Sequence, residues 1–185
     1  IKRRISKYKS LVEREKKLSK SGGRGLSIKK DGAARIILIG ITNSGKSTLL
    51  KNITNAKPEI AEYDFTTKKP EIGTLDYDGI ILQVIEIPAI TKNYLEKEKG
   101  PAYMGIVRDS DLIVIVSRDK KDVDLVKKEL DDAGIKFNGI VLNSEDVKAK
   151  EKIWKKLRLV YVYTKSPGKD KDYPPIALRK KSNVR

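Results

Sequence analysis

Cysteine and histidine are both absent from the 185 residues of the sequence. Their absence excludes disulfide bonds, thiolate or imidazole metal ligands and histidine-based acid–base chemistry. Trp and Phe are scarce, with one and two copies, so the core must consist mainly of Ile, Leu and Val. No apolar run approaches the roughly 20 residues that a membrane-spanning helix needs, and no secretory signal pattern opens the chain. We therefore expect a soluble, cytoplasmic protein with no membrane partner.

Positive charge is abundant, but it is concentrated at the two ends of the chain. The formal net charge is +16. Residues 1–30 carry 12 Lys or Arg against 2 Glu, residues 165–185 carry 7 against 2 acidic residues, and the residues between them carry 22 against 21. A nearly neutral domain with basic ends predicts contact with an anionic polymer, which we interpret as ribosomal RNA. The alternative that stays open is that the Lys-rich ends serve only solubility or reflect a thermophile's composition.

Strand and helix patterns alternate through the middle of the chain. Continuous apolar runs predict buried strands, helical spacing predicts amphipathic helices, and Asp78-Gly79 is a strong hairpin-turn signal. The predicted strands are residues 35–40, 74–77, 80–87, 111–117, 139–142 and 159–164, and the predicted helices are 47–55, 122–133 and 147–157. This alternation predicts an α/β domain with a mainly parallel sheet over residues 31–158. Residues 1–30 are predicted to form a basic helix over 3–20 and a glycine-rich linker.

One segment matches the P-loop pattern at every fixed position, after a predicted strand and at the start of a helix. Its glycines let backbone N–H groups turn toward phosphates, and the helix N-terminus adds partial positive charge. Lys46 would bind the β and γ phosphates, and the Ser47 hydroxyl would ligate Mg²⁺. The alternative is a strand–helix turn that binds nothing. The predicted nucleotide-binding residues of this loop are Gly40, Ile41, Thr42, Asn43, Ser44, Gly45, Lys46, Ser47 and Thr48.

The segment after this helix resembles a known family. Residues 55–74, which read NAKPEIAEYDFTTKKPEIGT, look like the switch I signature of the Obg-related GTPases, and more closely that of the archaeal and eukaryotic developmentally regulated GTP-binding proteins. Residues 161–168, YVYTKSPG, resemble the start of the TGS domain of that family, so residues 159–185 would hold this β region in part. The resemblance implies a Ras-like G domain that binds GTP and GDP, acts with ribosomes and has a regulatory protein partner.

The resemblance also assigns roles to particular residues. Thr67 would be the switch I threonine, whose hydroxyl completes Mg²⁺ coordination and whose N–H senses the γ-phosphate, with Phe65 and Thr66 beside the nucleotide. Lys46 and Thr67 would be the catalytic residues. Asn43 matches the P-loop asparagine that helps to hold K⁺ in potassium-stimulated members, where the cation offsets transition-state charge. From the residues alone, positions 65–67 also fit an ordinary loop, and Asn43 also fits a loop cap.

Switch II departs from the family pattern. It should read Asp-x-x-Gly after its strand, and the sequence offers Glu86 and Ala89 instead. Glu86 can still reach a Mg²⁺-bound water because it is one methylene longer than Asp. Ala89 retains the N–H that would meet the γ-phosphate, but its Cβ hinders rotations that Gly allows. Ile90 occupies the position of the water-orienting Gln of many GTPases, which predicts slow hydrolysis without a partner.

The Asn-Lys-x-Asp sequence with which GTPases read guanine has no clear copy. Asn143-Ser-Glu-Asp146 has the spacing, so Asp146 could pair with the guanine edge, but Ser144 stands in place of Lys. Too few residues separate it from the strand predicted at 159 to hold the usual last strand and helix of a G domain. We therefore expect residues 135–143 to precede a missing segment that would bind the base.

These observations predict a slow, Mg²⁺-dependent GTPase switch that acts on ribosomes or in translation. Two alternatives stay open. The first is a degenerate protein that binds nucleotide or RNA without hydrolysis, which Glu86, Ala89 and the missing base motif favour. The second is a P-loop ATPase or small-molecule kinase, because the P-loop pattern alone does not distinguish these classes.

Overall fold

The computed structural model of the chain describes residues 28–54, 59–60 and 70–179. The basic helix predicted over residues 3–20, the glycine-rich linker after it, and Phe65, Thr66 and Thr67 lie outside these ranges, so their roles stay predictions. No helix within the described ranges is long and apolar enough to cross a membrane.

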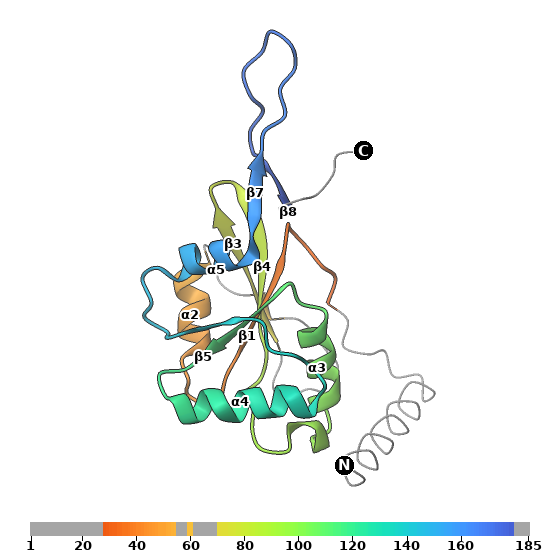
Figure 1. The fold of residues 1–185 in the computed structure, drawn as a ribbon, viewed down its shortest axis with the longest axis vertical. Helices are drawn as coiled ribbons and strands as arrows, with labels where there is room; N and C mark the ends of the chain where they lie inside the picture. The colour runs from red at the N-terminus through yellow and green to blue at the C-terminus, as the bar shows by residue number, and fades with distance from the viewer. Residues whose placement is uncertain (1–27, 55–58, 61–69, 180–185) are drawn as a thin grey trace, which may run out of the picture.

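A six-stranded sheet forms the centre of the described part (Figure 1). Its strands are β1 (Arg35–Ile39), β2 (Glu59–Ile60), β3 (Glu71–Tyr77), β4 (Ile80–Glu86), β5 (Leu112–Val116) and β6 (Ile140–Leu142). They lie in the order β2-β3-β4-β1-β5-β6. Strands β4, β1, β5 and β6 are parallel, and β2 and β3 are antiparallel to their neighbours. The prediction of an α/β domain with a mainly parallel sheet is confirmed.

Helices cover both faces of this sheet. They are α2 (Lys46–Ile53), α3 (Gly100–Arg108), α4 (Lys120–Asp132) and α5 (Ala149–Leu157), with the 3-10 helix η1 (Tyr94–Glu96). The predictions of α2, α4 and α5 are confirmed with ends shifted by one or two residues. Helix α3 is absent from the predicted elements, because Gly100-Pro101 reads as a helix breaker. Proline in the first turn of a helix loses no hydrogen bond, so the pair starts α3 instead of ending it.

Alternate residues of the central strands face two separate hydrophobic cores. In β1, Ile37 and Ile39 face the core under α3 and α4, whereas Ile36 and Leu38 face the core under α2 and α5. All five residues of β1 are buried. Burial on both faces explains why this strand reads as a continuous apolar run instead of an alternating pattern.

The position of α5 shows that the sheet ends at β6. The connections from β4 to β5 and from β5 to β6 are right-handed crossovers, which place α3 and α4 on the same face of the sheet. A helix that connected β6 to a further parallel strand beside it would lie on that face too. Helix α5 lies on the opposite face, where its Ala149 and Ile153 pack in one core with Leu49 of α2. The expected lack of a last strand agrees with this end of the sheet, but the expectation that no last helix fits is wrong. That residues 135–143 precede a missing base-binding segment stays a prediction. A nine-residue helix fits between β6 and residue 159.

Residues 159–179 form a hairpin that projects from the sheet domain (Figure 1). Its strands, β7 (Leu159–Val162) and β8 (Ile176–Arg179), pair antiparallel as a separate two-stranded sheet. Trp154 of α5 stacks on Tyr77 and on Tyr161, with ring centroids 4.9 and 4.7 Å apart. This stack holds the base of the hairpin against the domain.

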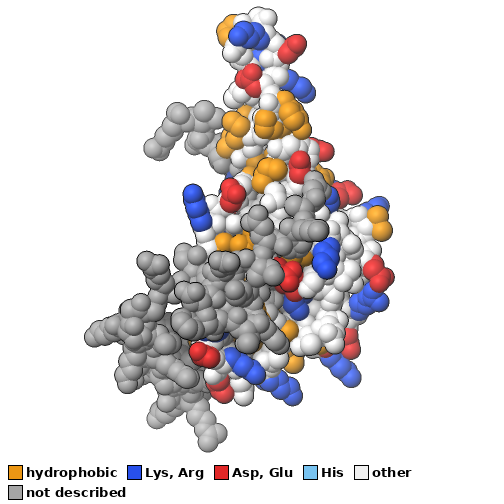
Figure 2. Space-filling model, turned by 180° about the vertical axis from the view of Figure 1, so that it is seen from behind, with side chains coloured by type: hydrophobic (Ala, Val, Ile, Leu, Met, Phe, Trp, Pro, Cys, Tyr) orange, Lys and Arg blue, Asp and Glu red, His pale blue; other side chains and the backbone are white. Residues whose placement is uncertain are grey.

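The rest of the hairpin is incompletely covered. Hydrophobic side chains gather on it below its tip (Figure 2). Val160 of β7 and Ile176 of β8 are exposed. The strand predicted to reach Thr164 ends at Val162, and β8 is absent from the predicted elements because two prolines stand directly before it. A two-stranded sheet with exposed apolar residues is an incomplete folding unit. Its assignment to the start of a TGS-like domain stays a prediction.

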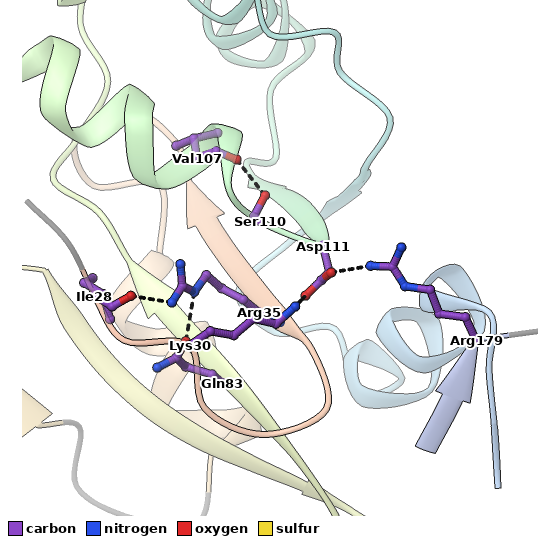
Figure 3. A network of polar contacts seen from close by, with 8 residues as sticks. All are labelled: Ile28, Lys30, Arg35, Gln83, Val107, Ser110, Asp111 and Arg179. Carbon is purple, nitrogen blue, oxygen red and sulfur yellow. Dashed lines mark hydrogen bonds and ion pairs between the residues drawn. The ribbon is translucent and has the colours of Figure 1, made fainter. Parts of the chain in front are cut away.

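Asp111, directly before β5, fastens both ends of the described chain to the sheet (Figure 3). Its Oδ2 accepts a hydrogen bond from the Arg35 N–H at 2.8 Å and pairs with Lys30 Nζ at 2.6 Å. Its Oδ1 pairs with Arg179 Nη2 at 2.5 Å. Burial alone would raise the pKa of Asp111, but the hydrogen bonds and charges of these partners outweigh it and lower that pKa.

We expect Asp111→Ala to reduce the free energy of unfolding by about 1–3 kcal/mol, because the Arg35 amide loses a charged acceptor. The exposed Lys30 and Arg179 contribute less, since solvent screens them. Because folding lowers the pKa, the contribution of Asp111 is full above its ordinary pKa of about 3.9 and is lost as pH falls through the lower folded value. Urea unfolding of both proteins at several pH values measures the difference. The exposed Asp109→Ala serves as control, and an equal loss there would contradict the assignment.

Candidate nucleotide-binding site

The P-loop lies between β1 and α2, at the carboxyl end of a buried central strand. Strand β1 ends at Ile39, and α2 begins at Lys46. Two residues of the loop adopt left-handed backbone conformations, Asn43 with φ 60° and Gly45 with φ 89°. The loop therefore curls back on itself before the helix starts, as an anion-binding turn at a helix N-terminus requires.

Both fixed glycines of the loop are pressed against neighbouring chain. A Cβ on Gly40 would lie 2.5 Å from Ser44 Oγ and 2.6 Å from the carbonyl oxygen of Val116 in β5. A Cβ on Gly45 would lie 2.5 Å from the Cβ of Ser144, and the φ of Gly45 adds strain for any other residue. The glycines that the sequence pattern requires are therefore also required by packing.

The Lys46 side chain folds back over the loop that it follows. Lys46 is only 6% exposed. Its Nζ donates to the carbonyl oxygen of Ile41 at 2.8 Å and lies 3.5 Å from Ser44 Oγ. The ammonium is thus held over the concave side of the loop, where the predicted phosphates would lie.

Ser47 and Glu86 form the second polar element of the site. Ser47 Oγ donates to Glu86 Oε1 at 2.9 Å, which joins the first turn of α2 to the end of β4. Glu86 Oε2 is buried and has no hydrogen-bond partner among the described residues. Burial raises the pKa of Glu86, and the Ser47 hydrogen bond and the Lys46 charge partly offset that rise. A hydroxyl and a carboxylate with a spare acceptor are the donor types that Mg²⁺ and its waters take, so these residues fit the predicted ion.

The segment after β4 passes directly beside the P-loop. The Ile87 N–H donates to the Leu38 carbonyl at 3.3 Å, and the Ile90 N–H donates to the Gly40 carbonyl at 2.9 Å. Half-buried Ala89 lies between them in sequence, and its contact with the γ-phosphate stays a prediction. The Ile90 side chain is 1% exposed and packs in the core under α3 and α4. Position 90 therefore places no side chain toward the phosphates.

Sequence reasoning missed a buried carboxylate that anchors this segment. Glu129 of α4 is 5% exposed and accepts hydrogen bonds from the N–H groups of Asn93 at 3.1 Å and Tyr94 at 2.9 Å. Tyr94 in turn donates its hydroxyl to the carbonyl of Pro88 at 3.3 Å. The signal in the sequence is position: Glu129 follows Val126 by three residues on the apolar face of α4, where a charged residue needs a partner.

The loop after β6 packs against the P-loop. Ser144 is buried beside Gly45, and its carbonyl accepts a hydrogen bond from Asn52 Nδ2 at 3.1 Å. Asp146 accepts from the Lys148 N–H at 3.1 Å and pairs with Lys152 Nζ at 2.5 Å. The hydrogen bond from Lys152, which outweighs a smaller effect of burial, lowers the pKa of Asp146.

The structure therefore gathers most of the predicted residues at one edge of the sheet. The whole P-loop, Glu86 and Ala89 lie together there, and exposed Thr48 follows on α2. Asn43 is exposed on the rim of the loop. Phe65, Thr66 and Thr67 are outside the described residues, so their approach to this site stays a prediction.

A strand, a glycine-containing loop, a helix with a buried Lys, and a Ser–carboxylate pair together define a P-loop nucleotide-binding domain. Residues 35–147 match the family described as 50S ribosome-binding GTPase. The chain belongs to this family and carries its GTPase domain.

The curated relatives include developmentally regulated GTP-binding proteins, in line with the resemblance seen in the sequence. Protein 2 of this group from Bos taurus is 31% identical over 142 residues, which are 75% of this chain and 39% of the relative. GTP-binding protein 1 of Schizosaccharomyces pombe is 34% identical over 125 residues, 65% of this chain and 34% of the relative. The chain thus spans less than half the length of these relatives.

Solved structures share the fold. The G domain of the T. maritima FeoB iron transporter aligns with a TM-score of 0.51 and 18% identity, covering 67% of this chain and 96% of that one. A GDP-bound mutant of S. thermophilus NFeoB aligns with a TM-score of 0.50 and 18% identity, covering 68% of this chain and 61% of that one. The prediction of a Ras-like G-domain fold is confirmed.

We expect Lys46→Ala to weaken triphosphate binding about 100-fold or more, because charge-assisted hydrogen bonds to two phosphates are removed. Isothermal titration calorimetry with GTP and Mg²⁺ measures the affinity. Lys128→Ala, which removes an exposed ammonium from α4, should bind as the parent does. An unchanged affinity of Lys46→Ala would show that the loop does not hold the phosphates.

Proposed function

We propose that the chain is the nucleotide-binding part of a slow, Mg²⁺-dependent GTPase switch that acts on ribosomes in the cytoplasm. The Ser47–Glu86 hydrogen bond beside the Lys46 ammonium carries the proposal, because it joins the P-loop helix to the strand end where switch II begins. The printed description of the family, a ribosome-binding GTPase, supports the ribosome as the place of action.

In this proposal the P-loop amides and Lys46 bind and orient the β and γ phosphates and stabilise the charge that develops during transfer. Ser47 would hold Mg²⁺ directly, and the spare oxygen of Glu86 would accept from one of its waters. When bound, Mg²⁺ neutralises charge on the phosphate oxygens. Thr67 would complete the ion's ligands. Its hydroxyl and N–H would respond to the γ-phosphate.

The hydrolysis step has few side chains to support it. Ile90 is buried in the core, so it cannot orient the attacking water. Asn43 offers a side-chain carbonyl on the exposed rim of the loop, a donor type that suits K⁺. We propose an intrinsic rate on the order of 10⁻⁴ to 10⁻² per second, which K⁺ or a regulatory protein partner raises.

A non-hydrolysing scaffold is the second candidate. Buried Ile90, the Cβ of Ala89 and the engaged carboxylate of Asp146 favour it. In that case nucleotide binding would stabilise the domain without turnover. The measured rate of phosphate release distinguishes the two candidates.

We expect single-turnover reactions with GTP to release phosphate slowly in Na⁺, faster in K⁺ and fastest with ribosomes present. Asn43→Ala should lose most of the K⁺ stimulation, because the proposed cation ligand is removed, and titration calorimetry measures its GTP affinity separately. Lys46→Ala provides the background rate. Absence of phosphate release in every condition would favour the scaffold over the GTPase.

The proposed RNA contact lies at the opposite edge of the sheet from the P-loop. Lys30 of the first basic segment and Arg179 of the second both pair with Asp111 at the amino end of β5. A cavity of about 410 Å³ opens there, and Lys156 and Arg158 add positive charge to its lining. One residue of each basic segment thus lies at the same place on the domain, which supports a single site for an anionic polymer.

We expect the affinity for ribosomal RNA to fall steeply with salt. Removal of residues 1–20 should flatten the log–log slope, and Lys156→Ala with Arg158→Ala should reduce it by about 0.7–0.9 for each phosphate that the protein no longer neutralises. Filter binding over a range of KCl concentrations measures the slope, with Lys128→Ala as the matched control. Slopes equal to that of the parent would exclude these groups from RNA binding.

A further inference from the structure

Discrimination of guanine from adenine uses acceptors, because guanine presents N–H donors at positions 1 and 2, where adenine has a ring-nitrogen acceptor and a C–H. A carboxylate is the strongest such acceptor, since charge-assisted hydrogen bonds exceed neutral ones. The sequence contains no Asn-Lys-x-Asp at any position, and residues 143–146 alone have its Asn and Asp at the right spacing. The base specificity of the site therefore depends on what this loop can offer.

The loop is close enough to the P-loop to contact a bound nucleotide. It follows β6, and the carboxyl ends of β1, β5 and β6 lie at the same edge of the sheet. Ser144 is buried against Gly45, and Asn52 of α2 holds its carbonyl. The loop of residues 143–146 therefore lies close enough to the P-loop for its side chains to reach the base of a bound nucleotide.

Asn143, Glu145 and Asp146 of this loop each already have a partner within the protein. Asn143 Oδ1 accepts from the Glu145 N–H at 2.9 Å, and Glu145 pairs with Arg118. Asp146 Oδ1 accepts from the Lys148 N–H, and its Oδ2 pairs with Lys152 Nζ at 2.5 Å. Asp146 therefore caps the approach to α5 and balances a charge on it.

The fold leaves no second segment in this place. Because α5 lies on the α2 face, β6 is the last strand of the sheet, and no further strand end stands beside it in the described residues. The phosphate-binding elements are complete at this edge, whereas the acceptors that would read the base serve the local structure instead.

We infer that the site recognises the Mg²⁺-triphosphate group and accepts nucleoside triphosphates without discriminating guanine from other bases. This inference rests on the phosphate-binding part of the proposed function and widens the substrate from GTP to nucleoside triphosphates in general. The observation behind this inference is that a complete P-loop lies beside a loop in which Asp146 accepts a hydrogen bond from the Lys148 N–H and forms an ion pair with Lys152.

Competition binding to the purified chain tests the inference. A fluorescent GTP analogue is bound in millimolar Mg²⁺ and displaced with GTP, ATP and UTP. We expect the three dissociation constants to agree within about three-fold, because no charged acceptor distinguishes the bases. A preference for GTP of about ten-fold or more would overturn the inference and leave the proposed nucleotide binding intact. Failure of the analogue and all competitors to bind would overturn both.

A pair of matched substitutions separates an effect on base recognition from an effect on stability. Asp146→Asn and Lys152→Ala both break the same ion pair, so both should lower the melting temperature, but only Asp146→Asn removes a carboxylate. We expect both variants to keep the parent's ratio of GTP to ATP affinity. Selective loss of GTP affinity in Asp146→Asn, with Lys152→Ala unchanged, would assign guanine reading to Asp146 and contradict the inference.

Discussion

Burial of β1 on both faces is the constraint on which the rest of the structure depends. Strands β4 and β5 pair with its two edges, and a hydrophobic core covers each face, so its direction and register are fixed. Its carboxyl end then delivers Gly40 against the Val116 carbonyl, with no space for a Cβ. Core packing at Gly40 therefore restricts the geometry of the P-loop.

Two clusters of charged residues lie at opposite ends of the parallel strands. At the carboxyl ends of its parallel strands, Lys46 lies over the P-loop and Glu86 lies beside Ser47. At the amino ends, Asp111 collects Lys30 and Arg179 from the two basic segments. A nucleotide and an RNA chain would therefore contact opposite edges of one rigid layer, and coupling between them would pass through the strands or around them through the helices.

Local patterns predicted most of the fold and the centre of the site. Strand β1 and the P-loop are contiguous in sequence, so the apolar run and the glycine spacing sufficed. Helix α3 was missed because Gly100-Pro101 has opposite meanings inside a helix and at its start. The packing of Ser144 on Gly45 joins residues about a hundred positions apart, and no local pattern encodes such a contact. The few residues between 146 and 159 already predicted that the usual last strand is missing, and the place of α5 on the α2 face agrees with it.

The anchoring of Asn93 and Tyr94 by Glu129 has a consequence for motion. The carboxylate is buried in an apolar core, so releasing the two amides would leave an unpaired charge there, at a cost of several kcal/mol. Helix α4 and the segment that follows β4 should therefore move together as one rigid unit when the nucleotide state changes. Slow hydrogen exchange at these two amides in every nucleotide state would accompany such concerted movement, and rapid exchange in one state would rule it out.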